Sequence, residues 1–560
     1  MSDAGDVVSR VYGGFRGVDF RGDEINLVRS PDSLNVWKDY KETDSIRTRP
    51  GFKVFQSFVE PVYGIFFYKN HTLVHSGTKL YKVASEASTA IYTQMNGAPS
   101  ECFVYNDILY IKDGKNYLQY NGVTVTEVVG FIPTTSIARK PSGGGTIYQD
   151  VNFLTGYRYN TFLADGESKE FLLDARNIDN IVPVVTVDDK EVTDFQIDYA
   201  TGKVTFSEAP PAPKTDGQDN VKIKFCKTIE GYADRIKKCT LLQVFDNRVF
   251  FSGNPDYPNV VYHCSLDDPS YCSDLDYYNE GLDNAAVKGM VAGNNALWVF
   301  REPSQSNTTV FYHTPTIDSD YGKIYPSTHS NVSTGCVGKA INFNDDIVFF
   351  SDRGMEGISG DVTTEQVLGH RSSMVDRKMV AEKSYKDMVL AEWEGYLIVF
   401  IGNKAYLADS RATFNNNGEM EYDWFYWDIG KKVNCARVEK GILYIGTDDG
   451  VYTLTDNNCD VVSYWVTPID KFKNPNRLKT TNKKSCTVEA IGEEIFVYAK
   501  TNRDEDFIPL GSFTNVTDAF NCRVKLKKFK DVQLKFYSNK RFALESATLE
   551  CFVGGYLKNL

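Results

Sequence analysis

The stretch DDIVFFSDRG at residues 345–354 decides the fold, because it places four bulky apolar residues between two polar turns. Apolar β-branched and aromatic side chains between turn residues are typical of a β-hairpin arm. Six other stretches have the same form: NHTLVHSG (70–77), NDILYIKDG (106–114), DNRVFFSG (246–253), NNALWVFRE (294–302), EGYLIVFIG (394–402) and KGILYIGTDDG (440–450). The chain therefore contains a repeated hairpin.

The spacing of these stretches indicates how the hairpins are arranged. They begin at residues 70, 106, 246, 294, 345, 394 and 440, and the one long interval contains a differently composed segment at 146–230. Repeats of about 40–50 residues with this composition are typical of β-propeller blades, which bury their faces against neighbouring blades around a ring. The sequence predicts an all-β protein with a propeller of six to eight blades. The alternative is a large all-β protein whose hairpins are unrelated.

Five regions follow from this pattern. We predict an N-terminal extended arm with ring-closing strands at 1–57, the first blades and a linker at 58–145, an inserted small β-sandwich at 146–232, the remaining blades at 233–460 and a C-terminal β-sheet domain at 461–560. The stretch KPSGGG (140–145) predicts a flexible joint. The stretch SSMVDRKMVAEKSYKDMV (372–389) predicts a short helix with Met374, Met379, Val380 and Met388 on one side.

Composition indicates a sheet-rich protein and bears on the compartment in which it folds. The chain has 560 residues, of which 42% are hydrophobic, and its 34 tyrosines and 35 phenylalanines suit sheets more than helix bundles. No apolar run reaches about 18 residues, so no membrane span is expected. The opening residues lack the pattern of a signal peptide, and the 11 cysteines contain no C-x-x-C pair. We expect reduced cysteines in a protein that folds in a cytosol.

The net charge of −12 bears on nucleic-acid binding. A protein that reads DNA sequence is normally basic, so sequence-specific binding is not expected. An acidic wall around a channel would let a duplex slide through, whereas ordinary solubilising charge is the plainer explanation. The stretch VKLKKFKDVQLKFYS (524–538) leaves two alternatives open, a nucleic-acid patch or the solvated face of a strand. Its cations are Lys525, Lys527, Lys528, Lys530 and Lys535.

Motifs for catalysis are missing from the sequence. It has no phosphate-binding loop, no G-x-S-x-G elbow and no H-E-x-x-H helix, and its six histidines lack metal-ligand spacing. Paired acidic residues at 188–189, 345–346 and 448–449 are explained by tight turns, in which Asp side chains bond their own backbone. Two acids facing one pocket would instead suit glycoside hydrolysis. The sequence predicts no enzyme and no catalytic, cofactor or metal site.

The aromatic stretch YDWFYW at 422–427 has two interpretations. Its rings would stack on sugars in a receptor-binding protein. Alternatively, a packed strand would place Tyr422, Trp424 and Tyr426 on one face and Phe425 and Trp427 on the other.

The opening GGFRGVDFRGDEINLVRSPDSLNVWKDYKETDSIRTRPGF (13–52) resembles the start of tailed-bacteriophage structural proteins. The similar steps are SPDSLNV (30–36) and RTRPG (47–51), and the resemblance continues at 253–272 and 333–361. The closest group is the β-propeller tail-hub or nozzle class, which includes the packaged-DNA stabilisation proteins. The inserted sandwich and the C-terminal sheet domain depart from that class.

The resemblance implies a structural virion protein of the phage tail, assembled in the bacterial host cytoplasm. Copies, six to match a phage tail axis, would form a ring beside the portal, the adaptor and other tail proteins. The ring would line the DNA channel, retain the genome and allow its ejection, without sequence-specific contact. We expect segment 13–51 to dock onto an adjacent subunit or adaptor through Gly13, Gly14, Asn35, Arg47, Arg49, Pro50 and Gly51. The alternative function is a glycan-binding or glycoside-hydrolysing propeller.

Overall fold

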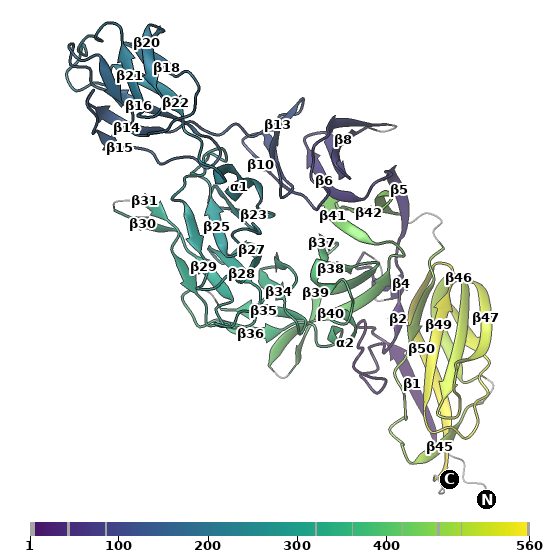
Figure 1. Cartoon of the computed structure of the whole chain (residues 1–560). Helices are drawn as coiled ribbons and strands as arrows, with labels where there is room; N and C mark the ends of the chain where they lie inside the picture. Colours follow the sequence, from purple (N-terminus) through teal and green to yellow (C-terminus); the bar gives the residue numbers. More distant parts are fainter. Residues whose placement is uncertain are drawn as a thin grey trace, which may run out of the picture.

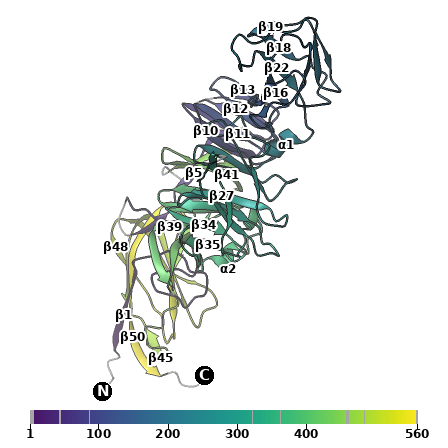
Figure 2. The same cartoon turned by 90° about the vertical axis from the view of Figure 1, so that its left-hand side faces the viewer.

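The computed structural model describes residues 6–41, 45–84, 87–319, 322–360, 362–416, 418–455, 460–482 and 484–556. Strands dominate these residues, with two short α-helices and one short 3-10 helix among them. Figure 1 shows a ring of sheets with an inserted domain at one end and the C-terminal domain at the other. Figure 2, turned by 90°, shows the same elongated order.

The ring contains seven four-stranded antiparallel sheets in the described part of the chain. The first three are β6 (Val62–Tyr68), β7 (His71–Ser76), β8 (Lys79–Val83) and β9 (Ser88–Tyr92); β10 (Glu101–Tyr105), β11 (Ile108–Lys112), β12 (Tyr117–Tyr120) and β13 (Val125–Glu127); and β23 (Leu241–Phe245), β24 (Arg248–Ser252), β25 (Val260–His263) and β26 (Tyr277–Asn279). The fourth is β27 (Val287–Gly293), β28 (Ala296–Arg301), β29 (Val310–His313) and β32 (Ser327–His329), with the hairpin β30 (Thr316–Asp318) and β31 (Gly322–Ile324) before β32.

The last three sheets complete the ring. They are β33 (Ala340–Phe343), β34 (Asp346–Phe350), β35 (Met355–Ser359) and β36 (Val367–His370); β37 (Val389–Trp393), β38 (Tyr396–Ile401), β39 (Lys404–Asn416) and β40 (Glu419–Asp428); and β41 (Val433–Glu439), β42 (Ile442–Thr447), β43 (Gly450–Thr455) and β5 (Gly51–Ser57). The seventh blade therefore takes its fourth strand from the N-terminal region. Strand β41 lies against β6, which closes the ring.

The prediction of an all-β propeller is confirmed. Each repeated stretch forms the second strand of a blade together with the turn before it. These turns use left-handed backbone, as at Asn106 (φ 45°) and Asp107 (φ 58°) or Asn294 (φ 51°) and Asn295 (φ 58°). Two residues with positive φ give the turn that matches strand twist, which is why Asn and Asp recur there.

The inserted domain has two sheets around one core. Its six-stranded sheet contains β14 (Thr134–Arg139), β15 (Thr146–Ile147), β16 (Tyr157–Phe162), β18 (Val184–Val187), β19 (Lys190–Val192) and β22 (Val221–Cys226). The smaller sheet contains β17 (Glu170–Leu172), β20 (Phe195–Asp198) and β21 (Lys203–Phe206). Buried Phe162 and Phe171 pack between the sheets.

Two features of the insertion differ from the prediction. Strand β14 lies before residue 146 and pairs with β15, so residues 140–145 form a turn within the domain rather than a joint. In addition, the insertion returns Phe153 to the ring. There it packs edge-on against Tyr262 of the third blade, in a core cluster that also includes Phe103 of the second blade. Helix α1 (Tyr232–Lys237) then leads into β23.

The C-terminal domain is an 11-stranded sheet. It contains β44 (Ser463–Val466), β45 (Arg477–Thr480), β46 (Cys486–Thr501), β47 (Ile508–Val516), β48 (Ala519–Cys522), β49 (Val532–Ser538) and β50 (Phe542–Tyr556). The N-terminal segment supplies the other four: β1 (Val7–Gly13), β2 (Ser33–Leu34), β3 (Val36–Lys38) and β4 (Ile46–Thr48). The region 1–57 is therefore shared between this sheet and the seventh blade.

The helix expected at 372–389 is reduced to two short pieces, α2 (Asp376–Met379) and the 3-10 helix η1 (Tyr385–Asp387). Met379 and Met388 are buried in a core cluster with residues of the fifth and sixth blades, whereas Met374 is buried beside the N-terminal segment and Val380 is half-buried. The methionine spacing reflects burial of an irregular connection. It does not reflect one face of a regular helix.

Candidate assembly site

The predicted assembly residues lie along a segment that fastens the propeller to the C-terminal sheet. Gly13 ends β1 opposite Ser546, and Gly14 follows with φ 61°. Gly51 begins β5, where it pairs with Thr455 of the seventh blade. Between these ends, the segment crosses the sixth blade.

Asn35 and Arg49 form the central contact of this segment, and both are buried. The Asn35 amide nitrogen donates to the Val462 carbonyl (2.8 Å), and its Oδ1 accepts from Arg49 Nε (3.0 Å) and from the Asp428 backbone N–H (2.8 Å). Arg49 Nη2 donates to the Asp428 carbonyl (2.8 Å). This Asn35–Arg49 contact joins the arm, β40 and the start of the C-terminal domain.

The backbone explains why asparagine stands at position 35. Its φ is 55°, in the left-handed region that asparagine tolerates better than most residues. This conformation directs the Asn35 N–H to the Tyr426 carbonyl, while the Asn35 carbonyl accepts from the Arg49 N–H (2.8 Å). One residue therefore satisfies buried polar groups from three parts of the chain.

Arg47 and Pro50 lie at a separate groove of about 620 Å³. In the sheet, Trp37, Arg47, Ala543 and Ile491 stand opposite one another on β3, β4, β50 and β46. Ile491 is exposed, whereas Trp37 packs on Trp393 of the sixth blade with ring centroids 5.1 Å apart. Asn35 and Arg49 thus lie in a buried contact and Arg47 and Pro50 at an open groove, while Gly13, Gly14 and Gly51 lie at the ends of the segment.

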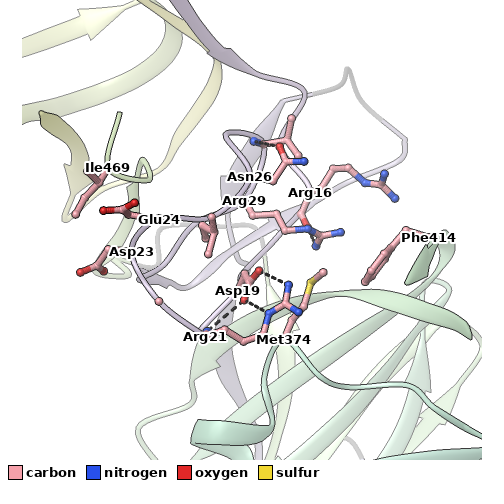
Figure 3. Close-up of a pocket in the computed structure, with 13 residues that line it drawn as sticks. Arg16, Asp19, Arg21, Asp23, Glu24, Asn26, Arg29, Met374, Phe414 and Ile469 are labelled. Atoms are coloured by element: carbon pink, nitrogen blue, oxygen red, sulfur yellow. Dashed lines mark hydrogen bonds and ion pairs between the residues drawn. The ribbon is translucent and has the colours of Figure 1, made fainter. Parts of the chain in front are cut away.

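A larger cavity of about 820 Å³ lies beside the same segment. Figure 3 shows arginines of the N-terminal segment around it, with Met374 and Phe414 from the propeller side and Ile469 from the C-terminal domain. Its lining therefore comes from three parts of the chain.

Asp423 of β40 anchors two of these arginines. Its buried carboxylate accepts from Arg16 Nε (2.7 Å) and from Arg29 Nη2 (2.5 Å). Arg29 also donates to the Arg16 carbonyl (2.8 Å), and its guanidinium lies 4.6 Å from the centre of the Phe414 ring. Burial lowers the pKa of Arg29 from its usual value, although the neighbouring Asp423 opposes this shift. Shared ion pairs of this kind fix the position of a segment because neither charge can leave without stranding the other.

Arg21 and Asp19 form a second ion pair at the cavity. Arg21 Nε and Nη2 donate to the two oxygens of the buried Asp19 (2.9 and 2.8 Å), and this hydrogen bonding raises the pKa of Arg21. Gly17 allows the N-terminal segment to lie close to the backbone of β40. Its φ is 81°, and a Cβ there would lie 2.0 Å from the Trp424 carbonyl oxygen. Only glycine fits that position without displacing backbone.

These contacts bear on the expectation that segment 13–51 docks onto an adjacent subunit. In the structure its strands pair within its own chain, and Arg16, Arg29, Asn35 and Arg49 are bonded there. The surface that it offers to a neighbour is therefore confined to the exposed parts of the segment.

The sequence did not indicate Arg16, Gly17 or Arg29 as separate residues, although all three lie in the Gly-rich opening. No local sequence pattern indicated Asp423.

Strand β1 supplies an exposed edge. In the described part of the chain it pairs only with β50, with Val7 opposite Phe552 and Val11 opposite Thr548. Val7 and Val11 are about 60% exposed, at 58% and 60%. An edge strand with exposed valines is a surface to which another strand can add.

The aromatic stretch 422–427 is packed inside the protein, so the proposal that its rings stack on sugars is wrong. Tyr422, Trp424 and Tyr426 belong to one core cluster, and Phe425 and Trp427 belong to another. The alternative of a packed strand with two aromatic faces is confirmed.

Other candidate groups are held in structural contacts. His75 is buried between Ser100 and the Gly77 carbonyl, and His71 bonds Tyr120. Asp188, Asp189 and Asp345 have positive φ, as turn residues do. Within the described ranges, no group of three or more His, Cys, Asp or Glu side chains is placed to hold a metal ion, and no helix is long and apolar enough to cross a membrane.

No protein-family model matches the chain, and no curated protein matches it either. Among solved structures, it is similar to the computationally designed Ika8 protein, with 11% identity, a TM-score of 0.31, and 72% of this chain and 98% of the other covered. BamB from Moraxella catarrhalis has 10% identity and a TM-score of 0.32, with 76% and 95% covered.

An exo-beta-1,3-galactanase from Phanerochaete chrysosporium has 10% identity and a TM-score of 0.22, with 55% of this chain and 95% of that chain covered. Likenesses this distant carry no argument about activity or partners. The function must be argued from the chain's own residues.

Proposed function

We propose that this chain is a structural virion protein of a tailed bacteriophage, a tail hub, nozzle or head-to-tail ring component that lines the DNA channel. The observation that carries the proposal is the Asn35–Arg49 contact. Asn35 belongs to the step SPDSLNV and Arg49 to the step RTRPG, the two steps that resemble phage structural proteins. Their meeting at a buried junction supports a common architectural role for both steps.

The connection between the propeller and the C-terminal domain also supports a structural role. The arm closes the seventh blade through β5, crosses the sixth blade and enters the C-terminal sheet, so that one continuous core cluster includes residues of β38, β40, β46 and β50. A shared core resists relative movement of the two domains. The free edge of β1 gives such a unit a surface for strand addition to a neighbouring copy or adaptor.

Cryo-electron microscopy of purified particles tests the proposal directly. We expect several copies in a symmetric ring around the DNA-bearing tail axis, beside the portal or adaptor. A protein that is absent from particles, or present away from the axis, would contradict the proposal.

Substitution of the β1 edge tests the contact. We expect Val7→Lys/Val11→Lys to fold normally, because both side chains are exposed, but to enter particles poorly, because lysine on an edge disfavours strand addition. The matched control is Val123→Lys/Val129→Lys, at positions 81% and 75% exposed near the second blade. Equal incorporation of the two variants would exclude the β1 edge as the contact.

A further inference from the structure

A row of cations lies on the C-terminal domain between β48 and β49. Residues 519–530 contain Arg523, Lys525, Lys527, Lys528 and Lys530 and no acidic residue. The side chains of Arg523, Lys525, Lys527 and Lys528 are exposed. We call these four residues the basic row.

Buried neighbours hold the basic row in place. Val524, Leu526 and Phe529 point into the core, with exposed fractions of 0%, 5% and 0%. The backbone of this extended segment bonds β45 and the residue after it: Lys479 and Phe529 exchange two hydrogen bonds, and the Thr481 N–H donates to the Leu526 carbonyl (2.9 Å). Exposed cations therefore alternate with buried apolar residues, as on the solvated face of a strand, although the row itself lies between β48 and β49 and in neither strand.

The backbone at Lys528 extends the row. Its φ is 49°, which interrupts the alternation so that Lys527 and Lys528 are both exposed while Phe529 returns to the core. A non-glycine residue with positive φ costs free energy and persists where the surroundings require it. Here its result is a fourth cation on the surface.

The basic row is also unpaired. None of its four residues forms an ion pair with any described residue, whereas other cations of this domain do: Lys471 with Glu24, and Lys540 with Asp460. Lys484, also exposed, lies on the neighbouring segment that leads into β46, where Cys486 stands opposite Cys522 of β48. Asp518 and Asp531 flank this segment, but neither forms an ion pair with the basic row among the described residues, so its four cations are available to an anion.

We propose that the basic row binds the phosphodiester backbone of double-stranded DNA without regard to sequence. Alternate residues of an extended segment lie roughly 6.6 Å apart, which is about twice the axial rise of about 3.4 Å per nucleotide along one DNA strand. Negative charge elsewhere on the protein is screened beyond about 8–10 Å at physiological salt, so the local charge decides the contact. This inference rests on the proposed function, because it gives the genome a point of contact with the tail protein.

The test is fluorescence anisotropy of a labelled duplex of about 30 base pairs with the full chain, titrated between about 50 and 200 mM salt. Three or four phosphate contacts predict a slope of log K against log salt of about −2.7 to −3.6. We expect Arg523→Gln/Lys525→Gln/Lys527→Gln/Lys528→Gln to weaken binding at least tenfold at the lowest salt and to bring the slope near zero.

The control removes four exposed cations elsewhere, as Lys79→Gln/Lys115→Gln/Arg176→Gln/Lys190→Gln, and changes the net charge equally. It should bind the duplex like the unmodified chain, and circular dichroism should show all three proteins folded. Absence of duplex binding by the unmodified chain, or equal loss in both variants, would overturn the inference. A ring seen on the tail axis together with no duplex binding would refute the basic row alone, whereas duplex binding by a protein absent from particles would refute the proposed function alone.

Discussion

At the scale of single residues, the contact between the arm and the sixth blade depends on the buried side chain of Asn35. Asn35 bonds the backbone at Val462 and Asp428 as well as the Arg49 side chain, all in one place. Removing its side chain leaves the Nε–H of the buried Arg49 guanidinium and the Asp428 N–H without their acceptor, and buried polar groups without partners are costly. The stability of the whole arm is therefore sensitive to this one amide.

We expect Asn35→Ala to lower the unfolding free energy by about 2–4 kcal/mol, measured by urea denaturation. Asn294→Ala is the control, because Asn294 has a similar φ of 51° in an exposed turn without such bonds. The control should lose about 1 kcal/mol, from backbone strain alone. Equal losses in the two variants would show that the amide contacts of Asn35 contribute nothing.

His370 gives the molecule a dependence on pH. Burial lowers the pKa of His370, but hydrogen bonds to Asp376 (2.5 Å) and the nearby Glu356, with their charges, outweigh burial and raise the pKa to about 10. An unfolded histidine has a pKa near 6.5. The folded state therefore holds one more proton than the unfolded state between these values, and stability falls as pH rises through this window.

The expected decline is at most about 1.4 kcal/mol per pH unit, the slope for one proton. Below about pH 6.5 the contribution of His370 is complete. Denaturation of His370→Gln between pH 6.5 and 10 should lack this component of the slope. An unchanged slope in the variant would assign the pH dependence to other groups.

At the scale of elements, the insertion is connected to the ring by more than its two chain crossings. Phe153 fills the junction of the second and third blades, and the Asn152 amide donates to the Phe131 and Ser270 carbonyls (2.9 and 2.8 Å). The insertion thus stabilises the ring at a point where the repeat is interrupted.

Substitution of two buried phenylalanines distinguishes the stability of the propeller from the stability of the inserted domain. We expect Phe153→Ala to lower the melting temperature of the propeller, with a loss of about 3–5 kcal/mol, because it opens a cavity between blades. Phe171→Ala should instead destabilise the inserted domain, where Phe171 packs with Phe206. Thermal unfolding monitored by hydrogen exchange distinguishes the two domains. Loss of protection from the same strands in both variants would contradict the expectation that each phenylalanine stabilises a different domain.

The elements also show what the sequence can predict. Six of the seven blades are built from contacts within about 50 residues, and the seventh adds β5 from the N-terminal region to three consecutive strands. The turn and strand signals of a blade therefore appear together in stretches such as 345–354. The site is different: Arg16 and Asp423 are separated by 407 positions, and no local pattern links them. The short steps at 30–36 and 47–51 marked the right segment, but their partners on β40 and in the C-terminal sheet required the structure.

At the scale of the whole molecule, the shared core makes the propeller and the C-terminal domain one unit. Phe15 and Trp37 of the arm lie in the same cluster as Trp427 of the sixth blade and Leu544 of β50. The inserted domain has its own core, centred on Phe171 and Val204. We expect two transitions in differential scanning calorimetry, the larger for the joint unit. A separate third transition for the C-terminal domain would contradict the shared core.

The pairing of β1 with β50 has a consequence for biosynthesis. Residues 7–13 leave the ribosome long before residues 546–552, their partners, exist. At about 5–20 residues per second, translation of the intervening chain takes roughly half a minute to two minutes. During that time the valines of β1 have no native strand beside them, while blades between them and their partner can form from local contacts. The danger of mispairing is thus greatest on the polysome, where many nascent copies hold this same strand unmatched side by side.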